Sequence, residues 1–184
     1  MSHESKSSLL VTLAAVLLAV AMVSSGCMRS PEEKYAQFME SGKQYAKDKD
    51  YDSAVLQFRN ATRAMPNEAE ALYQLALAEL ARGEPQEAAT AALKAERLDP
   101  EHRGVKMLLA EMMIMHPDLE VVQQGEERLE QLRLQAEGDS DVLFLLAATK
   151  RKLGSDDQDV QNLLEEALKN SPKHLQSRVA LARQ

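Results

Sequence analysis

The sequence contains one cysteine and four histidines, and neither these nor its acidic side chains are spaced as in an active site. The paired acids Glu126–Glu127 and Glu165–Glu166 have the spacing of the solvated face of an amphipathic helix. Glycine-rich phosphate loops, Gly-x-Ser-x-Gly elbows and Ser-x-x-Lys motifs do not occur. The histidines lack a carboxylate or cysteine at metal-ligand spacing; they are His3, His102, His116 and His174. The sequence therefore predicts no catalytic residue, no metal site, no cofactor and no enzymatic activity.

The single cysteine, Cys27, lies in surroundings that suggest a different chemistry. One cysteine can form neither an internal disulfide nor a cysteine-based zinc site. The preceding residues 9–23 are apolar except for one threonine, and this segment is shorter than the roughly 20 residues that span a bilayer. It fits the apolar core of a secretory signal, and the small residues Ser24, Ser25 and Gly26 lead directly into the cysteine. The sequence thus predicts an export signal.

Small residues that run into a cysteine resemble the lipobox, the signal of bacterial lipoproteins. The resemblance implies a signal peptide over residues 1–26, acylation of Cys27 with palmitate-type chains, and a linker over residues 27–31. Ser24 stands where that family prefers leucine. Met28 follows the cysteine, and a residue other than aspartate there is compatible with sorting to the periplasmic face of the outer membrane. Two alternatives stay open: nearby cleavage that leaves a free thiol, and an uncleaved membrane anchor.

Composition and charge limit the fold and the partners. Hydrophobic residues make up 45 % of the chain, aromatic residues only 4 %, and tryptophan is absent. Alanine and leucine favour helices, whereas sheets favour β-branched and aromatic side chains. The net charge of −7 argues against a nucleic-acid partner, because phosphate binding requires a basic surface.

The residues after the linker repeat with a period of about 34. Pro66 and Pro100 lie one period apart, and Pro172 follows after two more periods and four extra residues. The same residue types recur at matching positions of the units: Phe38, Gly42, Tyr45, Ala54, Phe58 and Ala61; then Leu72, Leu75, Ala76, Ala88, Ala92 and Ala95; and later Phe144, Ala147, Ala148, Val160, Leu164 and Ala167. Small residues at these positions would let two helices approach closely, and large ones would fill the space between units.

This pattern resembles the tetratricopeptide repeat, a unit of two antiparallel helices, over about residues 32–182. The resemblance implies an all-α fold, a right-handed α-solenoid within residues 32–184. We expect the final helix to cover the last apolar face; alternatively, the chain is a fragment of a longer array. The expected units are at about 35–68, 69–102, 103–140 and 141–174, with a terminal helix at 175–184.

Prolines and glycines predict where the helices begin and end. We expect Pro66, Pro100 and Pro172 to open helices, because proline is tolerated at the first helical position. Asp99 and Ser171 would then be N-caps. Glycines at 83 and 154 would end first helices in a left-handed conformation.

The third unit is irregular. Its first helix, at about residues 103–115, is followed by the helix-breaking sequence His116-Pro117-Asp118 and by a longer second helix near residues 119–136. Leu129 and Leu132 are expected on the buried face of that second helix. We interpret the additional residues as a neutral insertion in preference to a functional loop.

In tetratricopeptide proteins, bound peptides contact the concave side, which is formed by the first helix of each unit. The resemblance therefore implies a mainly apolar groove here, with charges of both signs. Some of its residues could instead pack between units or against a second copy. The lysine–asparagine–arginine clamp of the chaperone-binding subtype is not present. The predicted groove residues are Met39, Lys43, Tyr73, Leu77, Leu80, Met107, Glu111, Ile114, Leu145, Thr149 and Lys152.

A lipoprotein-type signal followed by such repeats resembles the bacterial tetratricopeptide lipoproteins, which are scaffolds for envelope assembly and export. The first unit, with Asp50-Tyr51 and Gln57-Phe58, is similar to lipoproteins of the exopolysaccharide-associated (PEP-CTERM) protein-sorting type. The resemblance implies a membrane-anchored scaffold that binds protein or peptide partners in the cell envelope. Two alternatives remain: a subunit that associates with itself, and a regulator of a cell-wall enzyme.

Overall fold

The computed structural model describes residues 29–182, and within this range every regular element is an α-helix. The signal peptide of residues 1–26, Cys27 and Met28 lie outside the described residues. None of the described helices is both long and apolar enough to cross a membrane. The helices are α2 (Pro31–Lys47), α3 (Tyr51–Ala64), α4 (Ala69–Ala81), α5 (Pro85–Leu98), α6 (Arg103–Met115), α7 (Leu119–Gln135), α8 (Ser140–Leu153), α9 (Asp157–Asn170) and α10 (Leu175–Leu181).

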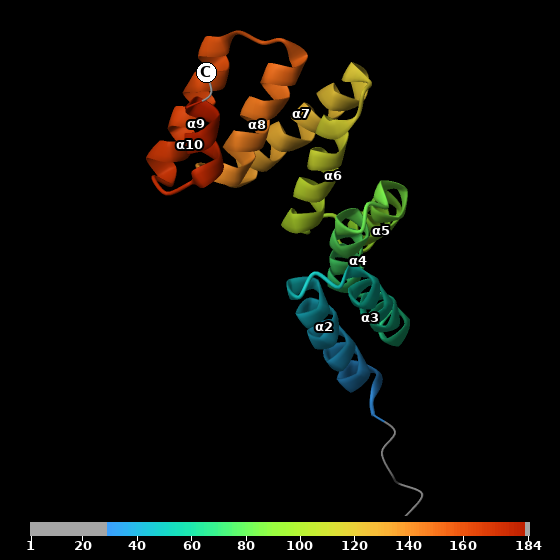
Figure 1. The fold of residues 1–184 in the computed structure, drawn as a ribbon. Helices are drawn as coiled ribbons and strands as arrows, with labels where there is room; N and C mark the ends of the chain where they lie inside the picture. The colour runs from blue at the N-terminus through green and yellow to red at the C-terminus, as the bar shows by residue number, and fades with distance from the viewer. Residues whose placement is uncertain (1–28, 183–184) are drawn as a thin grey trace, which may run out of the picture.

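Consecutive helices form pairs, and the pairs stack in chain order (Figure 1). The pairs are α2 with α3, α4 with α5, α6 with α7, and α8 with α9, and α10 packs against α9. Each second helix also contacts the first helix of the following pair, most thinly where α5 meets α6. The predicted all-α solenoid is confirmed.

Small residues allow the two helices of a pair to approach closely. A Cβ atom added at Gly42 in α2 would lie 2.5 Å from the ring of Phe58 in α3. Phe58 is fully buried, as are Ala54 and Ala61 on the same helix. Because Gly42 has no side chain, the phenyl ring of Phe58 occupies the space beside its backbone. The close approach at Gly42 was predicted, whereas Phe58 was expected to fill the space between units.

The prolines at the unit boundaries do not open helices, which corrects the sequence prediction. Pro66, Pro100 and Pro172 lie in the turns between units, and α4, α6 and α10 each begin three residues later. Asp99 and Ser171 are C-caps, because their backbone N–H groups still donate to the preceding helix, at Ala95 and Ala167.

Histidines cap two of these first helices. The Nδ1 atom of His102 accepts a hydrogen bond from the backbone N–H of Val105 at 3.2 Å. His174 does the same for Ser177 at 3.4 Å. The capping function that the sequence analysis gave to Asp99 and Ser171 therefore belongs to the residues three positions later in the chain.

The third pair follows its predicted boundaries. The α6 helix ends at Met115, Asp118 caps α7, and Leu129 and Leu132 are buried. Gly83 and Gly154 have φ angles of 87° and 77° and terminate α4 and α8, as predicted. This left-handed conformation is unfavourable for a residue with a side chain.

Glu79 in α4 is buried between two arginines. Its carboxylate oxygens lie 2.6 Å from a guanidinium nitrogen of Arg59 in α3 and 2.9 Å from one of Arg82. Both arginines reach solvent, so the charge of Glu79 is compensated without burying a cation. The triad links the second helix of one pair to the first helix of the next.

The buried side chains form two clusters that meet at α6. The first joins α2 to α5 and one side of α6, including Val105, Leu108 and Leu109. The second begins at Ala110 and extends through α7, α8 and α9, with Leu146 fully buried. Thus α6 contributes to both cores and connects the two halves of the solenoid.

Candidate functional site

The predicted partner-binding residues lie on the first helices α2, α4, α6 and α8, but not all are accessible. Met39 is only 6 % exposed and packs in the first core. Thr149 is fully buried, and its hydroxyl donates a hydrogen bond to the carbonyl of Leu145 at 2.7 Å. These two residues do not line an accessible surface, in contrast to the sequence prediction that they contact a partner.

Lys152 has a structural partner within the chain. From the end of α8, its Nζ atom donates hydrogen bonds to the carbonyls of Ile114 at 2.5 Å and His116 at 2.7 Å. It therefore satisfies unpaired carbonyl groups at the end of α6. Lys43, at the other end of the predicted site, is exposed on α2.

The apolar members of the predicted site are partly buried. Tyr73, Leu77 and Leu80 of α4 pack against the first core, and part of each side chain remains exposed. Met107, Ile114 and Leu145 of α6 and α8 pack in the same way against the second core. We call the accessible parts of these six side chains, together with Glu111, the first-helix face.

Tyr73 is held in place by two residues that the sequence analysis did not assign to the site. Its ring lies 5.0 Å, between centroids, from that of His102. A Cβ atom at Gly104 would lie 2.7 Å from the tyrosine ring, so the glycine makes room for it. Burial raises the pKa of Tyr73, and the negative charges of Glu70 and Glu111 raise it further. These five residues belong to α4 or to α6 and its N-cap, and they lie near one another.

Glu111 is the acidic residue of the first-helix face. It forms no ion pair within residues 29–182, and the residue as a whole is exposed. Partial burial of the carboxyl group raises its pKa because it removes water from the charged form, and the negative charge of Asp141 raises it further. A carboxylate in this environment would be stabilised by a cationic group brought by a partner.

A row of polar side-chain contacts links the starts of successive first helices. The Nε2 atom of His102 lies 3.1 Å from Glu70, Arg103 is paired with Asp139, and the Nε2 atom of His174 lies 3.0 Å from Asp141. Each contact joins the N-cap of one first helix to the first turn of the preceding one.

The geometry also indicates which nitrogen of each histidine carries a proton. In His102 and His174, Nδ1 accepts a backbone N–H, so in the neutral ring Nε2 carries the hydrogen that is donated to the carboxylate. This row of contacts was not predicted, because its members are about one repeat apart in sequence.

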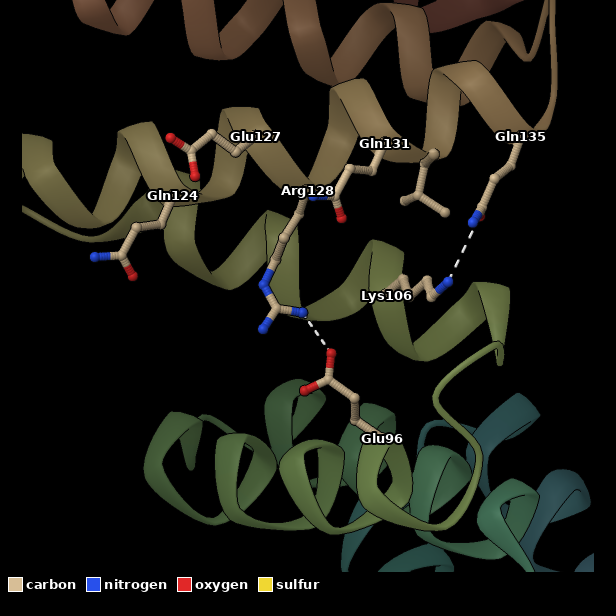
Figure 2. Close-up of a pocket in the computed structure, with 8 residues that line it drawn as sticks. Glu96, Lys106, Gln124, Glu127, Arg128, Gln131 and Gln135 are labelled. Atoms are coloured by element: carbon tan, nitrogen blue, oxygen red, sulfur yellow. Dashed lines mark hydrogen bonds and ion pairs between the residues drawn. The ribbon is translucent and has the colours of Figure 1, made fainter.

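A polar cleft of about 460 Å³ lies on the side of the second helices, between α5, α6 and α7 (Figure 2). Arg128 reaches across it from α7 to Glu96 on α5, and Lys106 contacts Gln135 at 3.5 Å. Charges of both signs thus pair across the cleft and connect the second unit to the third. Its lining residues are Glu96, Lys106, Gln124, Glu127, Arg128, Gln131, Leu132 and Gln135.

An apolar groove of about 420 Å³ lies at the C-terminal end of the described helices, between α8, α9 and α10. Its floor includes buried side chains of both α8 and α9. Leu175 and Val179 of α10 are exposed large apolar residues at its edge. We call this feature the end groove; it is lined by Phe144, Ala147, Ala148, Arg151, Val160, Leu164, Leu175, Gln176, Val179 and Ala180.

The sequence matches no protein-family model and no curated protein. Solved structures resemble the fold. MamA from Desulfovibrio magneticus is 18 % identical over 79 % of this chain and 80 % of its own, with a TM-score of 0.66. PilF of Pseudomonas aeruginosa is 17 % identical over 80 % of this chain and 65 % of its own, with a TM-score of 0.69.

The protein YrrB, described as a tetratricopeptide-repeat protein with an unusual peptide-binding site, is similar over 97 % of this chain and 86 % of its own. Its identity to this chain is 17 %, with a TM-score of 0.66. At this level of identity the likeness concerns the fold, and the chain has the fold of a tetratricopeptide-repeat solenoid.

Proposed function

We propose that this chain is a membrane-anchored, non-catalytic scaffold that binds segments of partner proteins along its first-helix face. The observation that carries the proposal is the composition of this face. It combines six partly exposed apolar side chains with Glu111, a carboxylate that lacks an ion-pair partner within the described residues. Apolar contacts provide affinity in such surfaces, and a few polar groups provide orientation.

The anchoring part of the proposal is supported by sequence. Cys27 follows small residues and an apolar segment, in an arrangement that resembles a lipobox. Acyl chains on this cysteine would attach the solenoid to a membrane, because each buried methylene contributes about 0.8 kcal/mol. We propose that the protein works at the periplasmic face of the outer membrane, in envelope assembly or export of the exopolysaccharide-associated type.

A crosslinking pull-down from native envelopes tests both parts. The full-length chain is compared with Cys27→Ala and with Glu111→Lys, and Glu165→Lys on the exposed part of α9 is the matched control. We expect Cys27→Ala to lose membrane association, and Glu111→Lys to lose the partner while staying on the membrane. The control should keep both properties. Retention of Cys27→Ala on the membrane would refute the lipid anchor, and equal recovery of partners by both lysine variants would refute the binding face.

A further inference from the structure

Two exposed apolar features of the molecule are not explained by partner binding on the first-helix face. The first is the turn between α6 and α7. Met115 is 76 % exposed and Leu119 is 51 % exposed, on either side of His116-Pro117-Asp118. We call residues 115–120 the knob.

Hydrogen bonds hold the knob in a defined shape. The backbone N–H of Asp118 donates to Nδ1 of His116 at 3.2 Å, and its carboxylate accepts from the N–H of Glu120 at 2.9 Å. Lys152 binds the carbonyl of His116 from α8. A fixed turn that displays two large apolar side chains to solvent is a typical binding element.

The second feature is the end groove. Its floor is apolar, and Leu175 at its edge is 67 % exposed. The equivalent surface of the second helix pair, α4 with α5, is covered by the next helix. Tyr73 and Leu77 of α4 pack against the first core, and α6 contributes side chains to that core. Within the described residues, α10 covers only part of the surface of α8 and α9, and the groove between the three helices is open.

The charges of the two features are complementary. The last turn of α8 carries three consecutive cations, and two of them are used inside the chain: Lys150 pairs with Glu126 at 2.9 Å, and Lys152 binds α6. Arg151 lines the end groove and has no ion pair within residues 29–182. The knob contains the exposed acids Asp118 and Glu120 beside its apolar side chains.

We propose that the knob of one copy of this protein docks into the end groove of a second copy. Met115 and Leu119 would cover the apolar floor, and Glu120 would approach Arg151. A chain does not fill its own groove, because α8 stands between the α6 end that carries the knob and the α10 side (Figure 1). Two complementary patches on one chain provide the conditions for self-association.

The test compares the full-length chain with two variants by sedimentation velocity in a mild detergent. The knob variant is Met115→Glu with Leu119→Glu, and the groove variant is Leu175→Glu with Val179→Glu. Leu119 and Leu175 are the first residues of their helices, where an acidic side chain is favourable, so both variants should fold. Circular dichroism verifies this. Leu134→Glu, at a site 83 % exposed and outside both features, is the matched control.

We expect the wild type and the control to associate as concentration rises, and each variant alone to have a dissociation constant at least about tenfold higher. Mixing the two variants should restore association, because the knob of the groove variant still fits the groove of the knob variant. Arg151→Glu should weaken association, and mixing it with Glu120→Arg should recover it.

Three results would overturn the proposal. The wild type could stay monomeric at every concentration. A chain that carries both the knob and the groove substitutions could associate as well as the wild type. The two variants could also fail to recover association when mixed, which would mean that the knob and the groove do not contact each other. If a helix of another protein occupies the groove instead, the purified wild type should stay monomeric, and this outcome too would count against self-association. Loss of partner binding in Glu111→Lys with unchanged association separates this interface from the first-helix face.

Discussion

Glu111 affects the folding stability of the chain in a way that depends on pH. Its folded-state pKa is raised above the ordinary value of 4.5, first by partial burial and then by the charge of Asp141. The native state therefore binds this proton more readily than the unfolded chain does. Protonated Glu111 therefore adds to the free energy of unfolding. This contribution is fully present below the pKa of the unfolded chain, and it is lost as the pH rises through the pKa of the folded state. At neutral pH, Glu111 thus reduces stability, which is a cost expected of a binding residue.

Replacing this carboxylate by an uncharged isostere should remove the cost. We predict that Glu111→Gln has a higher melting temperature than the wild type at about pH 7, and that the difference disappears at about pH 3.5, where the wild-type carboxylate is protonated too. Melting curves by circular dichroism at both pH values measure this, with Glu165→Gln as the control. An unchanged or lower melting temperature at neutral pH would contradict the interpretation.

At the scale of helices, two N-cap histidines also connect one unit to the preceding one. His102 stabilises the start of α6, stacks near Tyr73 and pairs with Glu70 on α4. A cap and a contact to the preceding first helix are thus combined in one side chain, and His174 repeats the arrangement with Asp141 and Phe144.

We predict that His102→Ala lowers the free energy of unfolding by about 1 kcal/mol, the usual cost of removing a capping side chain. Asparagine is a good N-cap, so His102→Asn should recover part of this loss. Urea unfolding followed by circular dichroism gives both values. If alanine and asparagine had the same effect, the cap would not be the source of the stability.

At the scale of the whole molecule, the solenoid has two cores that share only α6. Neighbouring units stabilise one another, and distant units do not touch, so a defect should remain partly local. The α6 helix links the two halves because its side chains belong to both cores, and the Glu96–Arg128 ion pair adds a contact between α5 and α7.

Leu146 tests this division, because it is fully buried in the second core. We predict that Leu146→Ala costs about 2–5 kcal/mol, through lost burial and the cavity that remains. Hydrogen exchange should accelerate strongly in α7, α8 and α9 and much less in α2 and α3. Phe58→Ala in the first core should give the opposite distribution. Equal acceleration along the whole chain in both variants would show one cooperative core.

Much of the architecture follows from the sequence alone. The spacing of the prolines and of the small residues indicates helix pairs with a period of about 34, and the left-handed ends at Gly83 and Gly154 and the break after Met115 were predicted at the right positions. These features depend on local residue type and spacing, which a repeat pattern records directly.

Only the tertiary structure decided which side chains reach solvent and which partners they have. Met39 and Thr149 occupy positions that face a ligand in the family pattern, but here neighbouring helices bury them. Lys152 binds the end of α6, and the cap of that helix is His102, not Asp99. Spacing within one helix defines its faces, but the packing of the adjacent units determines which of those faces remains exposed.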